Sequence, residues 1–97
     1  MKPYKKIEVV INALEKEHFV KILEKSGIRK FTMISEVTGR GDRGWQDGEG
    51  LTDSFKNVYF LVACSAEELD KLTEPMRLFI KKVGGVCMVS DVMWLKH

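Results

Sequence analysis

The sequence predicts an α+β domain, a ferredoxin-like βαββαβ sandwich with one four-stranded antiparallel sheet and both helices on one face. Four segments have the alternation or the apolar content of strands, and two segments have the spacing of amphipathic helices. Their order is β-α-β, loop, β-α-β, so one unit recurs after about fifty residues. A chain of 97 residues is the size of one domain, residues 1–97.

The first unit begins with a strand at residues 6–12 and continues with a helix. Asn12 and Glu15 have the spacing of a capping box at the start of that helix, and Gly27 fits the left-handed position after its end. The core face of the strand is predicted to consist of Ile7, Val9 and Ile11. The apolar face of the helix is predicted to consist of Leu14, Phe19, Ile22 and Leu23.

Two further strands follow, on either side of a glycine-rich segment. Residues 28–37 alternate in polarity and predict the second strand, and the aromatic and β-branched residues 55–64 predict the third. One face of the second strand is predicted to consist of Phe31, Met33, Ser35 and Val37.

The second helix has a clearer start, since Ser65 and Glu68 form a capping box. Pro75 is predicted to kink this helix or to interrupt its hydrogen bonding, and Gly84 with Gly85 ends it before a last strand at residues 86–95. Its apolar stripe is predicted to consist of Leu69, Leu72, Met76, Phe79, Ile80 and Val83.

The third and fourth strands are apolar on both faces, although helices cover only one face of such a sheet. The other face must meet something, most economically other copies of the chain, so the sequence predicts a cyclic oligomer. The first strand should lie between the third and fourth strands. That order separates Cys64 from Cys87 and predicts two free thiols.

Composition excludes several classes of function. The formal net charge of +2 is too small to indicate a nucleic-acid or membrane surface. The N-terminal residues lack a signal-peptide core and no apolar run is long enough for a membrane span, which predicts a cytoplasmic protein. No catalytic triad, Walker loop or metal-binding spacing is present, so the chain is not expected to be an enzyme or to bind a metal. His18 is expected at the edge of the first helix.

Residues 37–53 combine glycines with Arg40 and Arg43, two arginines that could converge on a phosphate as bidentate donors. Such a segment is more often a flexible loop, and both interpretations stay open at this level. Asp47, Glu49 and Asp53 could hold a divalent ion, but a solvated acidic loop is the more common interpretation.

The whole-chain order, with E-V-T-G-R-G-D-R-G at residues 36–44 and G-G-V-C-M-V-S-D-V-M-W at residues 84–94, resembles the PII signalling superfamily. This resemblance implies a homotrimer of ferredoxin-like subunits that binds adenine nucleotides in the clefts between subunits. It also implies that residues 37–53 are a flexible T-loop, in which Trp45, Gln46 and Asp47 would face a partner. By position, the nucleotide-binding residues would be Thr32, Thr38, Gly39, Arg40, Gly41, Asp42, Arg43, Gly84, Gly85, Val86 and Lys96.

Two departures from the family pattern limit which nucleotide and which function the resemblance implies. No lysine follows Gly85, which favours AMP, ADP or cyclic AMP over ATP, and the loop has no tyrosine. The chain is therefore similar to the PII-like proteins associated with carboxysomes and bicarbonate transporters, which implies bicarbonate as a second ligand. The expected function is control of inorganic-carbon uptake or fixation through a transporter or a carboxysome-related protein. A nitrogen-regulatory PII protein is the alternative within the superfamily.

Two other classes share this order of elements. An RNA-recognition domain would need stacking aromatics and glycines that residues 7–12 and 55–62 do not supply. A metal-tolerance or other small-ligand domain of the same sandwich would bind no nucleotide, and nucleotide binding separates it from the PII-like interpretation.

Overall fold

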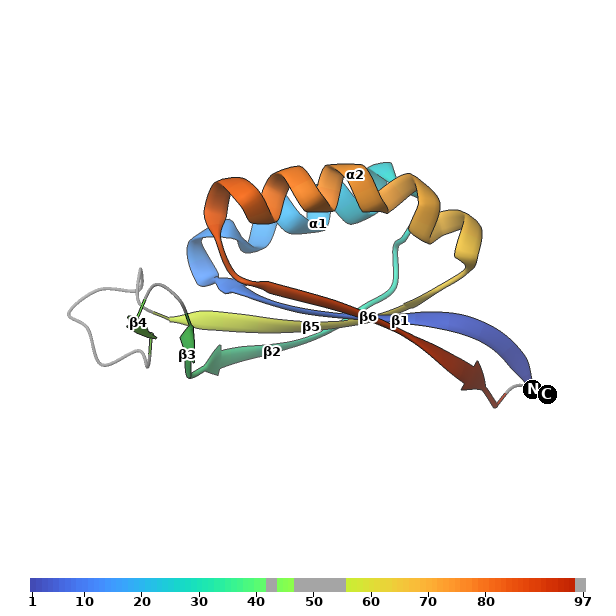
Figure 1. Ribbon diagram of the computed structural model, residues 1–97, viewed down its shortest axis with the longest axis horizontal. Coiled ribbons are helices and arrows are strands. Elements are labelled where there is room, and N and C mark those ends of the chain that lie inside the picture. Colours follow the sequence, from blue (N-terminus) through green and yellow to red (C-terminus); the bar gives the residue numbers. More distant parts are fainter. Residues whose placement is uncertain (42–43, 47–55, 96–97) are drawn as a thin grey trace.

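The computed structural model describes residues 1–41, 44–46 and 56–95 (Figure 1). Predictions for Asp42, Arg43, Asp47 and Lys96 therefore lie outside the described residues. The elements are β1 (Lys2–Asn12), the 3-10 turn η1 (Ala13–Glu15), α1 (Lys16–Lys25), β2 (Thr32–Val37), β3 (Gly39–Gly41), β4 (Gly44–Gln46), β5 (Asn57–Cys64), α2 (Ala66–Val83) and β6 (Val86–Trp94).

The main sheet confirms the predicted sandwich. Its four strands are antiparallel in the order β2-β5-β1-β6, with β1 between β5 and β6. Both helices lie on the same face of this sheet (Figure 1). Cys64 and Cys87 are free, as the strand order predicts.

The core fills the space between the sheet and the helices. Alternate residues of β1 and β5 are completely buried there, and the Phe19 ring of α1 meets the Phe60 ring of β5 edge-on with 4.7 Å between centroids. The predicted faces of β1 and α2 are confirmed, since Leu72, Met76 and Phe79 are buried. These apolar contacts supply most of the folding free energy.

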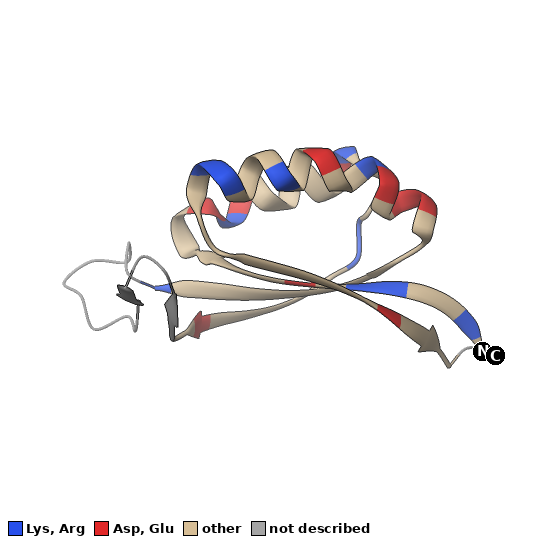
Figure 2. Cartoon of the chain, viewed as in Figure 1, with Lys and Arg blue, Asp and Glu red and all other residues tan. Residues whose placement is uncertain are grey.

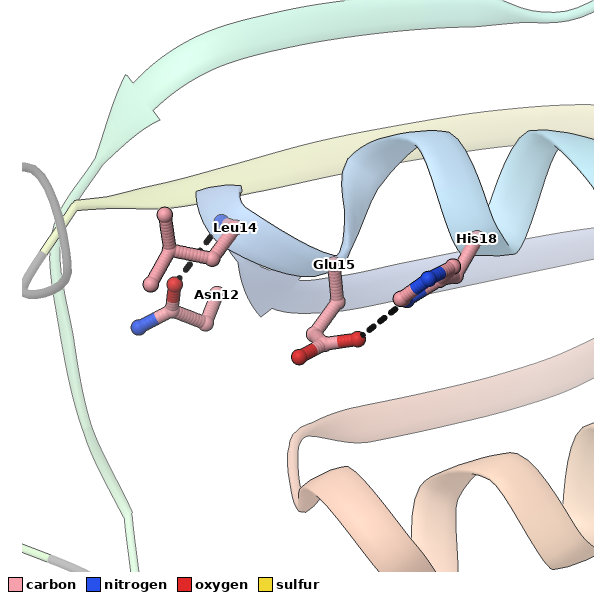
Figure 3. A network of polar contacts seen from close by, with 4 residues as sticks. All are labelled: Asn12, Leu14, Glu15 and His18. Carbon is pink, nitrogen blue, oxygen red and sulfur yellow. Dashed lines mark hydrogen bonds and ion pairs between the residues drawn. The ribbon is translucent and has the colours of Figure 1, made fainter.

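The prediction for Leu14 is wrong, because this residue is 64% exposed. Residues 13–15 form a 3-10 turn before α1, so Leu14 does not continue the apolar stripe of the helix. Asn12 caps this turn by accepting a hydrogen bond from the Leu14 amide at 2.8 Å (Figure 3). Figure 3 also shows the Glu15 carboxylate against His18, with Nδ1 to Oε1 at 2.8 Å, which leaves His18 at the surface.

The predicted capping box of α2 is confirmed, because Ser65 and Glu68 exchange hydrogen bonds with each other's backbone amides. α2 continues through Pro75 to Val83. Pro75 removes one helical hydrogen bond, but the buried side chains of Leu72 and Met76 on either side hold the helix against the sheet.

Two strand boundaries differ from the prediction by four residues each. β1 begins at Lys2 rather than residue 6, because residues 2–4 pair with β6 beyond the end of β5. β2 begins at Thr32 rather than residue 28, because Ile28 is still part of the α1 turn and donates its amide to the Leu23 carbonyl at 2.9 Å. Ile28 is also buried in the core.

The face of the sheet that the helices leave uncovered is called the open face here. Residues paired in register share a face, so the open face carries the exposed apolar side chains of Ile34, Leu61, Val86, Met88 and Trp94. Figure 2 shows that charged residues gather on the helices and are sparse along the strands. A polar group lies among these apolar residues, in which Tyr59 donates its hydroxyl to Glu8 at 2.8 Å and Lys6 lies 3.4 Å from the same carboxylate.

The hydrogen bond between Tyr59 and Glu8 predicts a pH-dependent contribution to stability. It lowers the pKa of Glu8 below its ordinary 4.5 and raises the pKa of Tyr59 above its ordinary 10.0. The contribution should be complete between these ordinary values, fall as pH drops through the lowered Glu8 pKa, and fall as pH rises through the raised Tyr59 pKa. Urea unfolding at one protein concentration measures the difference in stability between wild type and Tyr59→Phe. This difference should be largest between the two ordinary pKa values and smaller at lower and higher pH. In a Glu8→Gln background, the effect of Tyr59→Phe should no longer fall at acid pH, and a surviving fall there would contradict the assignment.

Candidate functional site

The glycine-arginine segment leaves the sheet at the end of β2. Gly39, Arg40 and Gly41 form β3, which pairs with β4 in the register Gly39 to Gln46, Arg40 to Trp45 and Gly41 to Gly44. This hairpin is a separate two-stranded sheet beside the main one (Figure 1). The predicted base of the loop and the predicted partner-facing residues Trp45 and Gln46 therefore lie on adjacent strands.

A second predicted group, Gly84, Gly85 and Val86, forms the turn from α2 to β6. Gly84 has φ 83° with ψ −166°, and Gly85 has φ 99°. These are left-handed or extended mirror-image conformations that favour glycine. A Cβ on Gly85 would lie 2.5 Å from the Val10 carbonyl oxygen, so glycine also allows a close approach of two backbones.

Both groups lie at the same end of the sheet. Val37 pairs with Asn57, Asn57 with Asn12, and Val86 with Val10. The end of β2 and the start of β6 are thus separated by three strand spacings, about 14 Å. Figure 1 shows the β3–β4 hairpin and the C-terminal end of α2 at this end of the molecule, opposite the two chain termini.

The other predicted residues lie elsewhere. Thr32 is the first residue of β2 and is exposed, about 17 Å along that strand from Val37. The last residue of β6 is Trp94, which precedes Lys96 by two positions. Trp94 pairs with Lys2 at the far end of the sheet. The chain therefore places Thr38, Gly39–Gly41 and Gly84–Val86 at one end of the sheet, on its two opposite edges, and keeps Thr32 and the end of β6 away from that end.

Sequence reasoning missed two residues at the base of the loop. Glu36 has φ 58°, and its carboxylate accepts a hydrogen bond from Lys56 at 3.0 Å. A glutamate in a strand gives no signal of a left-handed backbone, because that conformation depends on the pairing register.

A cavity of about 310 Å³ lies between α2 and the edge strand β6. Its lining is apolar apart from Thr73 and Arg77, and the Arg77 guanidinium is paired with Glu74. The cavity therefore lacks free donors for a phosphate. No helix in the described residues is both long and apolar enough to cross a membrane.

Known proteins share this fold. The family model described as "Nitrogen regulatory protein P-II" matches residues 4–97. No curated protein sequence gives a significant match. CPII from Thiomonas intermedia K12, a nitrogen regulatory PII-like protein in a structure with ADP, AMP and bicarbonate, has 24% identity and a TM-score of 0.85, over 93% of this chain and 86% of that chain.

Other solved structures agree with this fold. CPII bound to ADP and bicarbonate has 26% identity and a TM-score of 0.81, over 93% of this chain and 86% of that chain. A PII-like signalling protein from Thermus thermophilus has 20% identity and a TM-score of 0.73, over 94% of this chain and 88% of that chain. Because the family model spans nearly all of its residues, the chain belongs to the nitrogen regulatory protein P-II family.

Proposed function

We propose that the chain is a PII-like signal-transduction protein that binds ADP or AMP, with bicarbonate as a second ligand, in clefts between the subunits of a homotrimer. Cyclic AMP and ATP are further candidates for the same cleft. The observation that carries the proposal is the separation of the site residues along the sheet. Thr38 and Gly84–Val86 lie at one end of the subunit, whereas Thr32 and the end of β6 lie away from it. A cleft between neighbouring subunits joins such separate groups, and a site within one subunit does not.

The open face supports the trimer. Its exposed apolar side chains come from β2, β5 and β6, and Met88 in the edge strand β6 is 56% exposed. An apolar area of this extent on a small domain marks an interaction surface. The polar group of Glu8, Tyr59 and Lys6 is already paired within the subunit, so its burial would leave these groups satisfied.

The ligands are supported by the relatives and by the glycine turn. CPII structures contain ADP, AMP and bicarbonate. In this chain the turn at Gly84 and Gly85 leads directly into Val86, and offers backbone groups rather than a lysine ammonium. A nucleotide with fewer phosphates than ATP needs less positive charge, and Arg40 and Arg43 are the proposed donors to it.

The regulatory step is assigned to the loop. Ligand binding at its base would alter how Trp45, Gln46 and Asp47 are presented to a transporter or to a carboxysome-related protein in the cytoplasm. The protein acts as a sensor of inorganic-carbon status rather than as a catalyst.

Nucleotide-dependent thermal stabilisation tests this function. ADP or AMP at about 100 times its dissociation constant should stabilise the protein by roughly 2.7 kcal/mol, and bicarbonate should increase the shift in melting temperature. Arg43→Ala should weaken ADP binding by about 1.5–3 kcal/mol in titration calorimetry, because it removes a charge-assisted hydrogen bond.

Arg77→Ala is the matched control, since it removes an exposed arginine that is paired on α2. It should leave ADP affinity unchanged. If none of AMP, ADP, ATP and cyclic AMP changes the melting temperature, with or without bicarbonate, the proposed function is wrong.

A further inference from the structure

The end of β2 contains an irregular step. Ser35 pairs with Val58, and Val37 pairs with Asn57. Two steps along β2 therefore correspond to one step along β5. The extra residue is Glu36, whose φ of 58° makes it the one non-glycine residue with a positive φ among the described residues. This step is a β-bulge with a left-handed residue that is not glycine.

The bulge changes the direction in which the chain continues. Side chains alternate between the two faces of a strand, so one additional residue moves every later residue to the other face. The predicted alternation of β2 is broken at Glu36 for this reason. Thr38 and Gly39, which follow immediately, leave the sheet with the orientation that the bulge sets.

An ion pair connects the two strands between which the loop leaves the sheet, at the end of β2 and the start of β5. Lys56 Nζ lies 3.0 Å from Glu36 Oε1, and these residues flank the segment between β2 and β5. The Lys56 backbone is fixed in turn, because its carbonyl accepts a hydrogen bond from the Ala13 amide at 2.8 Å. The Glu36 side chain is 68% exposed, so the pair contributes little to stability, and the pairing of β2 with β5 sets the bulge.

We propose that Glu36 is a positioning residue for the adenine-nucleotide site: its left-handed bulge aims Thr38–Gly41 at the ligand. The consequence for binding rests on the proposed function, whereas the orientation of β3 does not. A residue in a sparsely populated conformation directly before a binding segment is typical of a pre-organised site.

The test compares substitutions that remove the same carboxylate but differ in left-handed preference. Glu36→Gly accepts φ near 60° without strain, Glu36→Ala has a Cβ and bears about the same strain as glutamate, and the β-branched Glu36→Val resists this conformation most. Two readouts are measured for each variant: the amide resonances of Gly39 and Gly41 in the ligand-free protein, and the affinity for ADP by titration calorimetry.

Glu36→Gly should keep both glycine resonances close to their wild-type positions and hold ADP affinity within about threefold, the effect of an exposed ion pair. Glu36→Val should move both resonances and weaken ADP binding by about tenfold or more, because strain of this size shifts the backbone toward a regular strand. Glu36→Ala should behave like wild type without the ion pair. If Glu36→Val does not fold, Glu36→Thr, which is β-branched but polar, against Glu36→Ala makes the same comparison.

Lys56→Met should reproduce the loss of the ion pair alone, with the small effect expected for Glu36→Gly. If Glu36→Val keeps the Gly39 and Gly41 resonances and the ADP affinity of Glu36→Gly, the positioning role is overturned. If the resonances move as expected but wild type binds no ADP, the bulge still orients β3 and the proposed nucleotide function is the part that fails.

Discussion

Gly85→Ala should destabilise the protein by about 2–5 kcal/mol, the largest single-residue effect expected on the fold. Two costs add at this position. The left-handed backbone, with φ 99°, opposes any side chain, and the new methyl group would lie 2.5 Å from the Val10 carbonyl oxygen and 3.0 Å from Ile11 Cγ2. The methyl group cannot be accommodated unless the pairing of β6 with β1 shifts. Urea unfolding at a fixed protein concentration measures the loss.

Gly27→Ala is a matched control for Gly85→Ala. Gly27 has φ 87°, but a Cβ there would meet no atom within 4 Å. It should cost only the backbone strain, about 1–2 kcal/mol. The difference between the two variants then measures the close approach of the glycine turn to β1. Equal costs at both positions would show that this approach relaxes without loss, contrary to our expectation.

Met88→Glu should convert the proposed trimer into monomers. Met88 lies in register with Glu8 on the open face, so the new carboxylate would lie beside an existing one. Burying an uncompensated charge costs about 3–5 kcal/mol, which weakens association by more than about a hundredfold. Sedimentation velocity measures the mass, and ADP binding should be lost with the trimer because the cleft needs two subunits.

Leu78→Glu adds the same charge to an exposed leucine on α2, outside the open face. It should leave both the mass and the ADP affinity unchanged. A trimer that persists in Met88→Glu would exclude the open face as the subunit interface. A monomer that still binds ADP with wild-type affinity would instead place the nucleotide site within one subunit.

The sequence was sufficient for those features that local patterns determine. The apolar alternation of Ile7, Val9 and Ile11 and the capping box at Ser65 predicted elements that the structure confirms. The prediction of Leu14 as a core residue was wrong because a 3-10 turn and an α-helix share the same start signal. Helical spacing alone does not distinguish them.

The candidate site was less accessible to prediction, because it depends on contacts between distant segments. The glycines at 84 and 85 could be assigned to a turn, but their approach to Val10 is visible only in the folded chain. The bulge at Glu36 depends on how β2 pairs with β5, and the ion pair with Lys56 joins residues on opposite sides of the loop. No local pattern reports either feature.

The position of β1 between β5 and β6 has a consequence during synthesis on the ribosome. β1 is made first, yet the strand that covers its second edge, β6, is made only after both helices. Until then a long strand with one apolar face has an unpaired edge, which is a template for wrong pairing with other chains. Such non-local pairing also slows folding. Nascent chains that stall within α2 are therefore expected to require a chaperone, whereas chains released after β6 can close the sheet.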